Sequence, residues 1–196
     1  MQEDPDQAAR INELLERHRQ GDASARGELL VYPAESLRNF IKNMFPDEDR
    51  LHRWELTDDV RQNLAIRMLE ALVEVKPVSA LHFFRLANQH IRWTLQDMAK
   101  HYYGRRGMGT RHDTDKAPLE GPDRRQDSDF DWDRFEKAMA ALSEVERDVF
   151  NLHEFNELPL TKVAKELEMS YGTVKIRYRD ARLKLQEALR DEAPGS

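Results

Sequence analysis

The sequence predicts an all-α protein built from two small helical domains that are joined by a flexible acidic linker. Its 196 residues include only 8 Gly and 8 Pro, so breakers of regular structure are few. Apolar residues recur at helical spacings, and no useful run alternates like a strand. Charged residues make up 35% of the chain, which suits amphipathic helices better than a deep sheet core. We expect the first domain at 7–109, the linker at 110–133 and the second domain at 134–191.

Helical spacing and end signals predict the first two helices. The first, near 7–19, is indicated by the apolar residues Ile11, Leu14 and Leu15. Gly21 and Asp22 end this helix and cap the next. The second helix covers about 23–45, and we expect Pro33 to kink or break it, since proline removes a helical hydrogen bond.

A third helix is predicted from Thr57 to about Val75. Thr57 is a good N-cap, and Asp58 and Asp59 fall in the first turn, where the helix dipole favours acids. Pro77 closes the helix.

The fourth helix begins at Ser79 and has two distinct faces. Its buried stripe consists of Phe84, Ala87, Ile91, Leu95 and Met98. The opposite side carries His82, Arg85, Gln89, Trp93, Gln96 and Lys100. Cations, amides and an aromatic ring on one face suit single-stranded nucleic acid, because bases stack on the ring and phosphates meet the cations. The alternative is that Trp93 packs on a neighbouring helix and the remainder is ordinary surface.

The net charge of −6 is unevenly distributed. Residues 98–112 contain no acid and four bases, including Arg105 and Arg106, whereas 113–133 contain eight acids and three bases. The basic segment suits a nucleic-acid backbone. The acidic segment is polar and broken by Pro and Gly, which predicts a linker without stable structure.

The second domain begins at Trp132 and Phe135 and contains a helix–turn–helix pattern. Ser143 and Glu146 have capping-box spacing and open a helix at 145–155. A short helix follows, whose apolar face is Val163, Ala164 and Leu167, and then a turn at 168–170. The last helix is capped by Ser170 and buries Val174, Tyr178, Ala181 and Leu185. Its other faces carry Lys175, Arg177, Arg179, Arg182 and Lys184.

A helix with this much positive charge fits the major groove of DNA. The alternative is a solvated basic helix in an all-helical domain. The run 172–182, GTVKIRYRDAR, resembles region 4 of bacterial sigma factors, most closely the extracytoplasmic-function (ECF) group, and the similarity extends back to 141–144. It implies recognition of the minus-35 promoter element by Ser170, Thr173, Lys175, Ile176, Arg177, Arg179 and Arg182.

The first half resembles region 2 of the same group, more diffusely. The run 57–62 is similar to the helix that docks on the clamp helices of the largest RNA polymerase subunit, which implies core polymerase contacts by Asp59, Gln62 and Leu69. The run 83–102 is similar to the helix that grips the minus-10 element. It implies DNA contacts by Arg85, Gln89, Arg92, Trp93, Gln96, Lys100, Arg105 and Arg106.

The resemblance therefore implies a sigma factor that binds core polymerase at the clamp helices and the flap, recognises both promoter elements and helps melt DNA. No cofactor or metal and no enzymatic activity is expected. An anti-sigma factor or another recruiting protein is a further partner that the resemblance allows. The acidic linker is expected to thread the polymerase channel later used by RNA.

Four residues depart from the family pattern. Asp180 replaces a basic residue and Ile176 a small polar one, which affects the upstream sequence that is read. Glu168 replaces a frequent Gly in the turn, where a positive φ would cost about 1 kcal/mol. Pro159 replaces the usual Ser or Thr cap.

Two other functions are alternatives to the sigma factor. One is a helix–turn–helix regulator that acts without core polymerase. The other is an enzyme, with Asp97 and His101 as metal ligands and His90 or His112 as a third; no nucleophile–base set accompanies them.

Composition also limits the chemistry and the cellular location of the protein. Cysteine is absent, which excludes disulfides, a Cys-zinc site and thiol chemistry. No basic signal segment opens the chain and no apolar run has the roughly 20 residues of a membrane span, so we expect a cytoplasmic protein without membrane contact.

Overall fold

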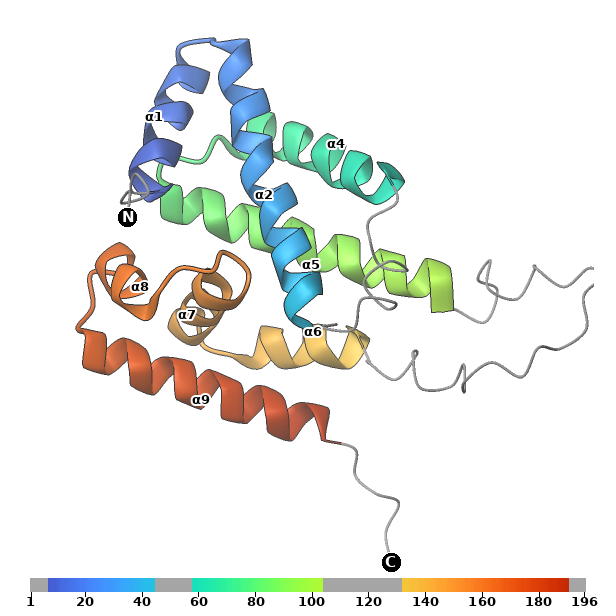
Figure 1. The fold of residues 1–196 in the computed structure, drawn as a ribbon, viewed down its shortest axis with the longest axis vertical. Coiled ribbons are helices and arrows are strands. Elements are labelled where there is room, and N and C mark those ends of the chain that lie inside the picture. The colour runs from blue at the N-terminus through green and yellow to red at the C-terminus, as the bar shows by residue number, and fades with distance from the viewer. Residues whose placement is uncertain (1–6, 45–57, 104–131, 191–196) are drawn as a thin grey trace, which may run out of the picture.

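The computed structural model describes residues 7–44, 58–103 and 132–190, and it confirms the all-α fold: within these ranges every regular element is a helix. The first half contains α1 (Gln7–Arg19), α2 (Ala23–Met44), α4 (Asp58–Val75) and α5 (Ala80–Tyr103). The second half contains α6 (Trp132–Ala141), α7 (Glu144–Glu154), α8 (Leu160–Glu166) and α9 (Tyr171–Leu189). In Figure 1, α5 crosses the middle of the molecule, with α1 and α4 above it and α6 to α9 below it, while α2 runs across α5 and ends near α6.

Helix α5 is the central element of the first half. Its predicted apolar stripe is confirmed, because Phe84, Ala87, Ile91 and Leu95 are all buried against the other helices. The side chain of Met98 lies outside the described part of the chain. The helix starts where Asn12 Oδ1 on α1 accepts a hydrogen bond from the Ala80 amide at 2.7 Å, which satisfies one of the free donors at the helix start.

Helix α2 begins as predicted but is not broken at its proline. Asp22 Oδ1 accepts a hydrogen bond from the Ser24 amide at 2.9 Å, so the predicted cap is present. Of the kink or break expected at Pro33, the break is absent, because α2 runs unbroken through Pro33. Leu29 and Leu37, one turn to either side, are fully buried. Their packing holds the two segments in one helix despite the missing amide.

The second half is organised by α9, which packs against α6, α7 and α8. The capping box predicted for α7 is confirmed: the Glu146 amide donates to Ser143 Oγ, and the Ser143 amide donates to Glu146 Oε2. Val149, Leu152, Val163, Val174 and Ala181 fill the space between these helices.

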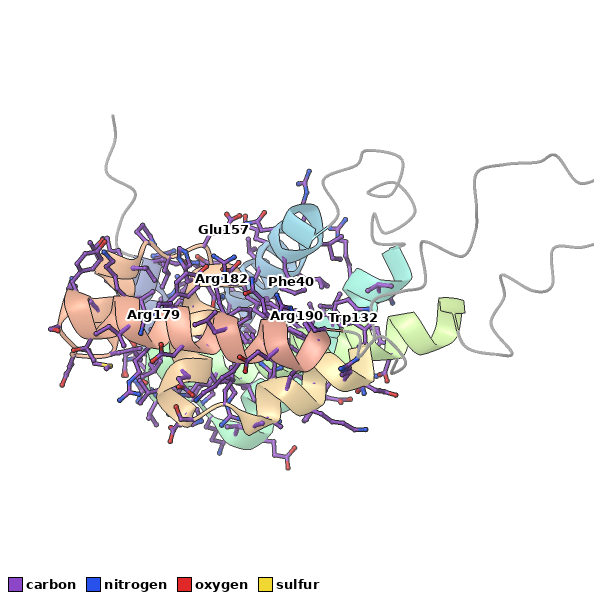
Figure 2. The ribbon with its side chains drawn as sticks, turned by 90° about the horizontal axis from the view of Figure 1, so that it is seen from below. Phe40, Trp132, Glu157, Arg179, Arg182 and Arg190 are labelled. Carbon is purple, nitrogen blue, oxygen red and sulfur yellow. The ribbon has the colours of Figure 1, made fainter. Side chains whose placement is uncertain are left out.

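The two halves share one continuous apolar core. Phe40 of α2 stacks on Phe155 at the end of α7, with ring centroids 4.0 Å apart and planes 5° from parallel. Trp132 and Phe135 of α6 lie 6.3 and 6.4 Å from the same ring. Phe40 and Trp132 are labelled near each other, toward the C-terminal end of α9, in Figure 2. Every ring around Phe40 in this cluster therefore comes from the other half.

None of the helices in the described ranges is both long enough and apolar enough to cross a membrane.

Candidate nucleic-acid interface

The turn between α8 and α9 is a Schellman motif. The Met169 amide donates to the Ala164 carbonyl at 2.9 Å, and the Glu168 amide donates to the Lys165 carbonyl at 3.2 Å. Glu168 has φ of +52°, which confirms the left-handed conformation considered from the sequence. This motif ends α8 sharply and sets the direction in which α9 leaves.

The start of α9 is fixed by the predicted cap. Ser170 Oγ accepts a hydrogen bond from the Thr173 amide at 3.1 Å and lies 2.8 Å from Thr173 Oγ1. Both side chains were predicted to contact DNA, and both are engaged in the cap. Pro159 stands at the N-cap of α8 and provides no side-chain hydrogen bond.

The inner face of α9 is close to the one predicted. Val174, Ala181 and Leu185 are buried, whereas Tyr178 is only partly buried. The Tyr178 hydroxyl donates to Glu154 of α7, and its ring packs edge-on against His153. Burial, followed by the hydrogen bond to Glu154, raises the pKa of Tyr178 to about 12.

The outer face of α9 carries the predicted DNA contacts. Its exposed residues include Lys175, Ile176, Arg177, Arg179 and Arg182. Figure 2 shows Arg179 and Arg182 along this helix. Arg179 donates from Nε and Nη2 to Oδ1 of Asp180 at 3.1 and 2.9 Å, so the acid in the basic run is paired with its neighbour. Arg182 lies over the ring of Tyr178, 5.7 Å from its centroid.

Lys184 has a structural role that its place in the basic run does not reveal. Its Nζ lies 2.7 and 2.8 Å from the two carboxylate oxygens of Glu146, whose side chain is only 4% exposed. The hydrogen bond from Lys184 lowers the pKa of Glu146. Lys184 therefore joins α9 to the capping box of α7.

The predicted DNA face of α5 is divided by the second half. Gln89 and Trp93 are exposed, and Trp93 lies edge-on to His90. Arg85 and Arg92, in contrast, are paired with the second half, and Arg92 is only 7% exposed. Arg92, which the resemblance implies as a DNA contact, is here bonded to Glu136 of α6 and Asn151 of α7.

The remaining predicted contacts of the first half are placed only in part. Gln96 donates to Asp133 of α6. Lys100 lies on α5, but its side chain is outside the described residues, and so are Arg105 and Arg106.

Burial governs the electrostatics where α5 meets α7. The Asp148 carboxylate accepts two hydrogen bonds from Arg85 Nε at 3.1 Å and a third from Nη2, and it is 6% exposed. Burial raises the pKa of Asp148, and the Arg85 guanidinium opposes this shift. Burial likewise lowers the pKa of Arg92, opposed by Glu136. Each buried charge thus depends on its partner in the other half.

Helix α4 carries an exposed apolar stripe of Ile66, Leu69 and Val73, of which only Leu69 was predicted from the sequence. Leu69 and Gln62 are exposed, as a docking surface requires, and Asp59 lies in the first turn, with its side chain outside the described residues. Ile66 and Val73 were missed, although they are 49% and 52% exposed. Positions 59, 62, 66, 69 and 73 are spaced 3, 4, 3 and 4 apart, which places them on one face. That spacing was visible in the sequence.

Within the described residues, no three His, Cys, Asp or Glu side chains are grouped so that they could hold a metal ion. Asp97 is instead paired with Arg67 of α4 at 2.6 Å. The third-ligand candidate His112 and the side chain of His101 lie outside the described residues.

Residues 132–185 match a protein family described as sigma-70, region 4. The match covers about a quarter of the chain and runs from the start of α6 through most of α9. No curated protein matches the chain. The helix–turn–helix half is therefore similar to sigma-70 region 4, a family of DNA-binding domains rather than of enzymes.

Proposed function

We propose that the chain is a sigma factor of the ECF type. It binds core RNA polymerase, recognises the minus-35 and minus-10 promoter elements and promotes DNA melting at the start of transcription. The observation that carries this proposal is the cationic outer face of α9, presented by a helix–turn–helix that matches sigma-70 region 4. Such a protein works where the polymerase and the chromosome are, in the cytoplasm. An anti-sigma factor or another recruiting protein is a further proposed partner.

Recognition of duplex DNA is assigned to α9. Its exposed Lys and Arg side chains meet phosphates and guanine edges, and Ile176 offers an apolar contact to a thymine methyl. Asp180 holds the guanidinium of Arg179 and thereby limits the directions in which it can reach. A bidentate contact between an arginine and a guanine edge discriminates between bases by about 1–3 kcal/mol.

Binding to core polymerase is assigned to the α4 stripe. Three branched apolar side chains, Ile66, Leu69 and Val73, stand more than a third exposed on one face. The alternating spacing of 3 and 4 suits packing against another helix. Asp59 and Gln62 continue the same face and add polar contacts that fix the register. The proposed occupant is the clamp-helix pair of the largest polymerase subunit.

Capture of the melted strand is assigned to α5. Trp93 supplies a ring for base stacking, and Gln89 supplies an amide beside it. Arg85, Arg92 and Gln96 are also proposed contacts. They can bind DNA only after their hydrogen bonds to α6 and α7 are broken. Lys100, Arg105 and Arg106 are proposed phosphate contacts that follow along the chain.

Two titrations test these assignments. Binding to a pool of duplex DNA, measured across salt concentrations, should weaken when Arg177 is changed to Ala, and the slope of log K against log salt should fall by about one. Arg38→Ala, which changes an exposed arginine of α2, is the matched control and should leave both the affinity and the slope unchanged.

Titration of the chain with core polymerase should show direct binding. Failure to bind core polymerase would remove the sigma factor proposal.

The same titration separates a second candidate, a DNA-binding regulator that acts without core polymerase. It is favoured by one observation: the family match covers the helix–turn–helix half alone. Duplex binding through α9 without any core polymerase binding would select this candidate.

A further inference from the structure

Helix α5 has a continuous polar stripe that faces the second half. Its members are Arg85, Asn88, Arg92 and Gln96, at helical spacings of 3, 4 and 4. Each of them makes a hydrogen bond to α6, α7 or the turn after α7. Apart from Asn88, these are residues proposed to bind the minus-10 strand.

The groups that hold this stripe are mainly carboxylates. Asp148 and Glu144 of α7 take the guanidinium of Arg85, with Glu144 2.9 Å from Nη2. Glu136 of α6 lies 3.0 Å from Arg92 Nε. A carboxylate and a phosphate offer an arginine the same paired anionic oxygens. The second half therefore occupies the cations that a DNA backbone would use.

Apolar and amide contacts complete the interface. Phe40 is enclosed by Trp132, Phe135 and Phe155. Asn156, in the turn after α7, donates to Ser36 Oγ at 2.9 Å and accepts from Asn88 Nδ2 at 2.8 Å. Asn88 Oδ1 is buried without a hydrogen-bond partner among the described residues, an unmet capacity that separation of the halves would relieve.

We propose that this interface is an autoinhibitory latch: α6 and α7 compete with single-stranded DNA for Arg85, Arg92 and Gln96. The proposal rests on the function proposed above for α5. In the latched chain the outer face of α9 stays exposed. On α5, Arg92 is buried, and the more exposed Arg85 and Gln96 are held by Asp148 and Asp133 of the second half. The free chain therefore meets duplex DNA through α9 but does not hold a single strand until the two halves separate.

The test changes the latch without changing α5. Glu136→Lys with Asp148→Lys places positive charge opposite Arg92 and Arg85 in the full chain. Its matched control is Glu16→Lys with Glu35→Lys, which makes the same change in net charge at exposed positions of α1 and α2. Phe40→Ala is a second latch variant that leaves the net charge unaltered and guards against misfolding of the double variant; circular dichroism checks helicity in each.

Separation and binding are measured on the same proteins. Because the chain has no Cys, dyes placed at Val31→Cys and Lys162→Cys report the separation of α2 and α8 by energy transfer. A labelled pool of single-stranded DNA is the ligand. We expect both latch variants to lose energy transfer and to bind the pool at least tenfold more tightly than the control. Adding Trp93→Ala to a latch variant should remove most of that gain.

The latch is overturned if the helical latch variants lose energy transfer but bind single strands no more tightly than the control. It is also overturned if energy transfer persists in both variants, or if the unaltered chain already binds single strands as tightly as they do. Core polymerase titration keeps the two proposals apart. A chain that binds core polymerase and directs initiation, but whose latch variants show no gain, overturns the latch alone.

Discussion

Glu168 has a strained backbone conformation that the fold tolerates. Its φ of +52° lies in the left-handed region, where a side chain costs about 1 kcal/mol and glycine costs little. The Schellman hydrogen bonds of the two neighbouring amide groups hold it there. This position could be recognised from the sequence because the turn chemistry is local.

We predict that Glu168→Gly stabilises the protein by up to about 1 kcal/mol, because glycine adopts the left-handed conformation freely. The free energy of unfolding in urea measures the effect. Glu168→Ala is the control, since it removes the same charge but keeps a Cβ. Equal stabilisation by Ala and Gly would show that loss of the charge, rather than relief of strain, is responsible.

Tyr178 gives a prediction at alkaline pH. Its pKa of about 12 in the folded protein lies above the ordinary value near 10, so its contribution is complete below pH 10 and is lost as the pH rises through 12. Tyr178→Phe should therefore lower the melting temperature at pH 8 and have little effect near pH 12. A difference that stays constant across this range would contradict the assigned hydrogen bond to Glu154.

Other residue roles could not be predicted from the sequence, for a physical reason. Ser170 and the pair Ser143–Glu146 act on amides within three residues, so spacing reveals them. Lys184 and Arg92 have partners that only the tertiary fold brings near, Glu146 and Glu136. Their charge suggested DNA contact, whereas both are engaged in ion pairs within the protein.

At the scale of the helices, periodicity predicted most boundaries closely. The first helix was expected near 7–19, where α1 lies, and the helix expected at 145–155 is α7, Glu144–Glu154. At Pro33, where a kink or break was predicted, there is no break: α2 is one continuous helix, and the kink stays a prediction. The tendency of proline to break a helix is overcome when buried residues on both sides hold the helix together.

The α4 stripe yields a prediction at this scale. Ile66→Glu should leave the free energy of unfolding within about 0.5 kcal/mol, because the side chain is already exposed. Its affinity for core polymerase should fall at least tenfold, because a charge would enter an apolar interface. Val31→Glu, at a similarly exposed position on α2, should leave the affinity unchanged. Equal effects from both variants would remove the assignment of α4.

For the whole molecule, the sequence predicted two domains and an acidic linker at 110–133. Residues 110–131 lie outside the described part of the chain, and residues 132–133 belong to α6 instead. The packing of the halves on one core was not predictable. Phe40 and Phe155 are far apart in sequence, and their contact leaves no periodic signal. Arg85 and Gln96 were predicted on a polar face of α5, whereas Asn88, which also contacts the second half, was not. The sequence shows that a face is polar but not whether protein or DNA covers it.

A shared core predicts that the halves unfold together. Urea transitions followed by tryptophan fluorescence and by circular dichroism should coincide. Phe40→Ala should lower the free energy of unfolding by about 3 kcal/mol, because it removes a ring enclosed by three others. Val31→Ala, at an exposed position of the same helix, should change it little. Two separate transitions in the unaltered chain would contradict the shared core.

The central claim is that the chain directs core RNA polymerase to promoters. It is tested most directly by transcription in vitro with purified core polymerase and a pool of upstream DNA, with and without the protein, followed by mapping of the RNA start sites. The account predicts new start sites that share two spaced sequence motifs, the upstream one lost with Arg177→Ala. The absence of new start sites, together with no binding to core polymerase, would contradict it.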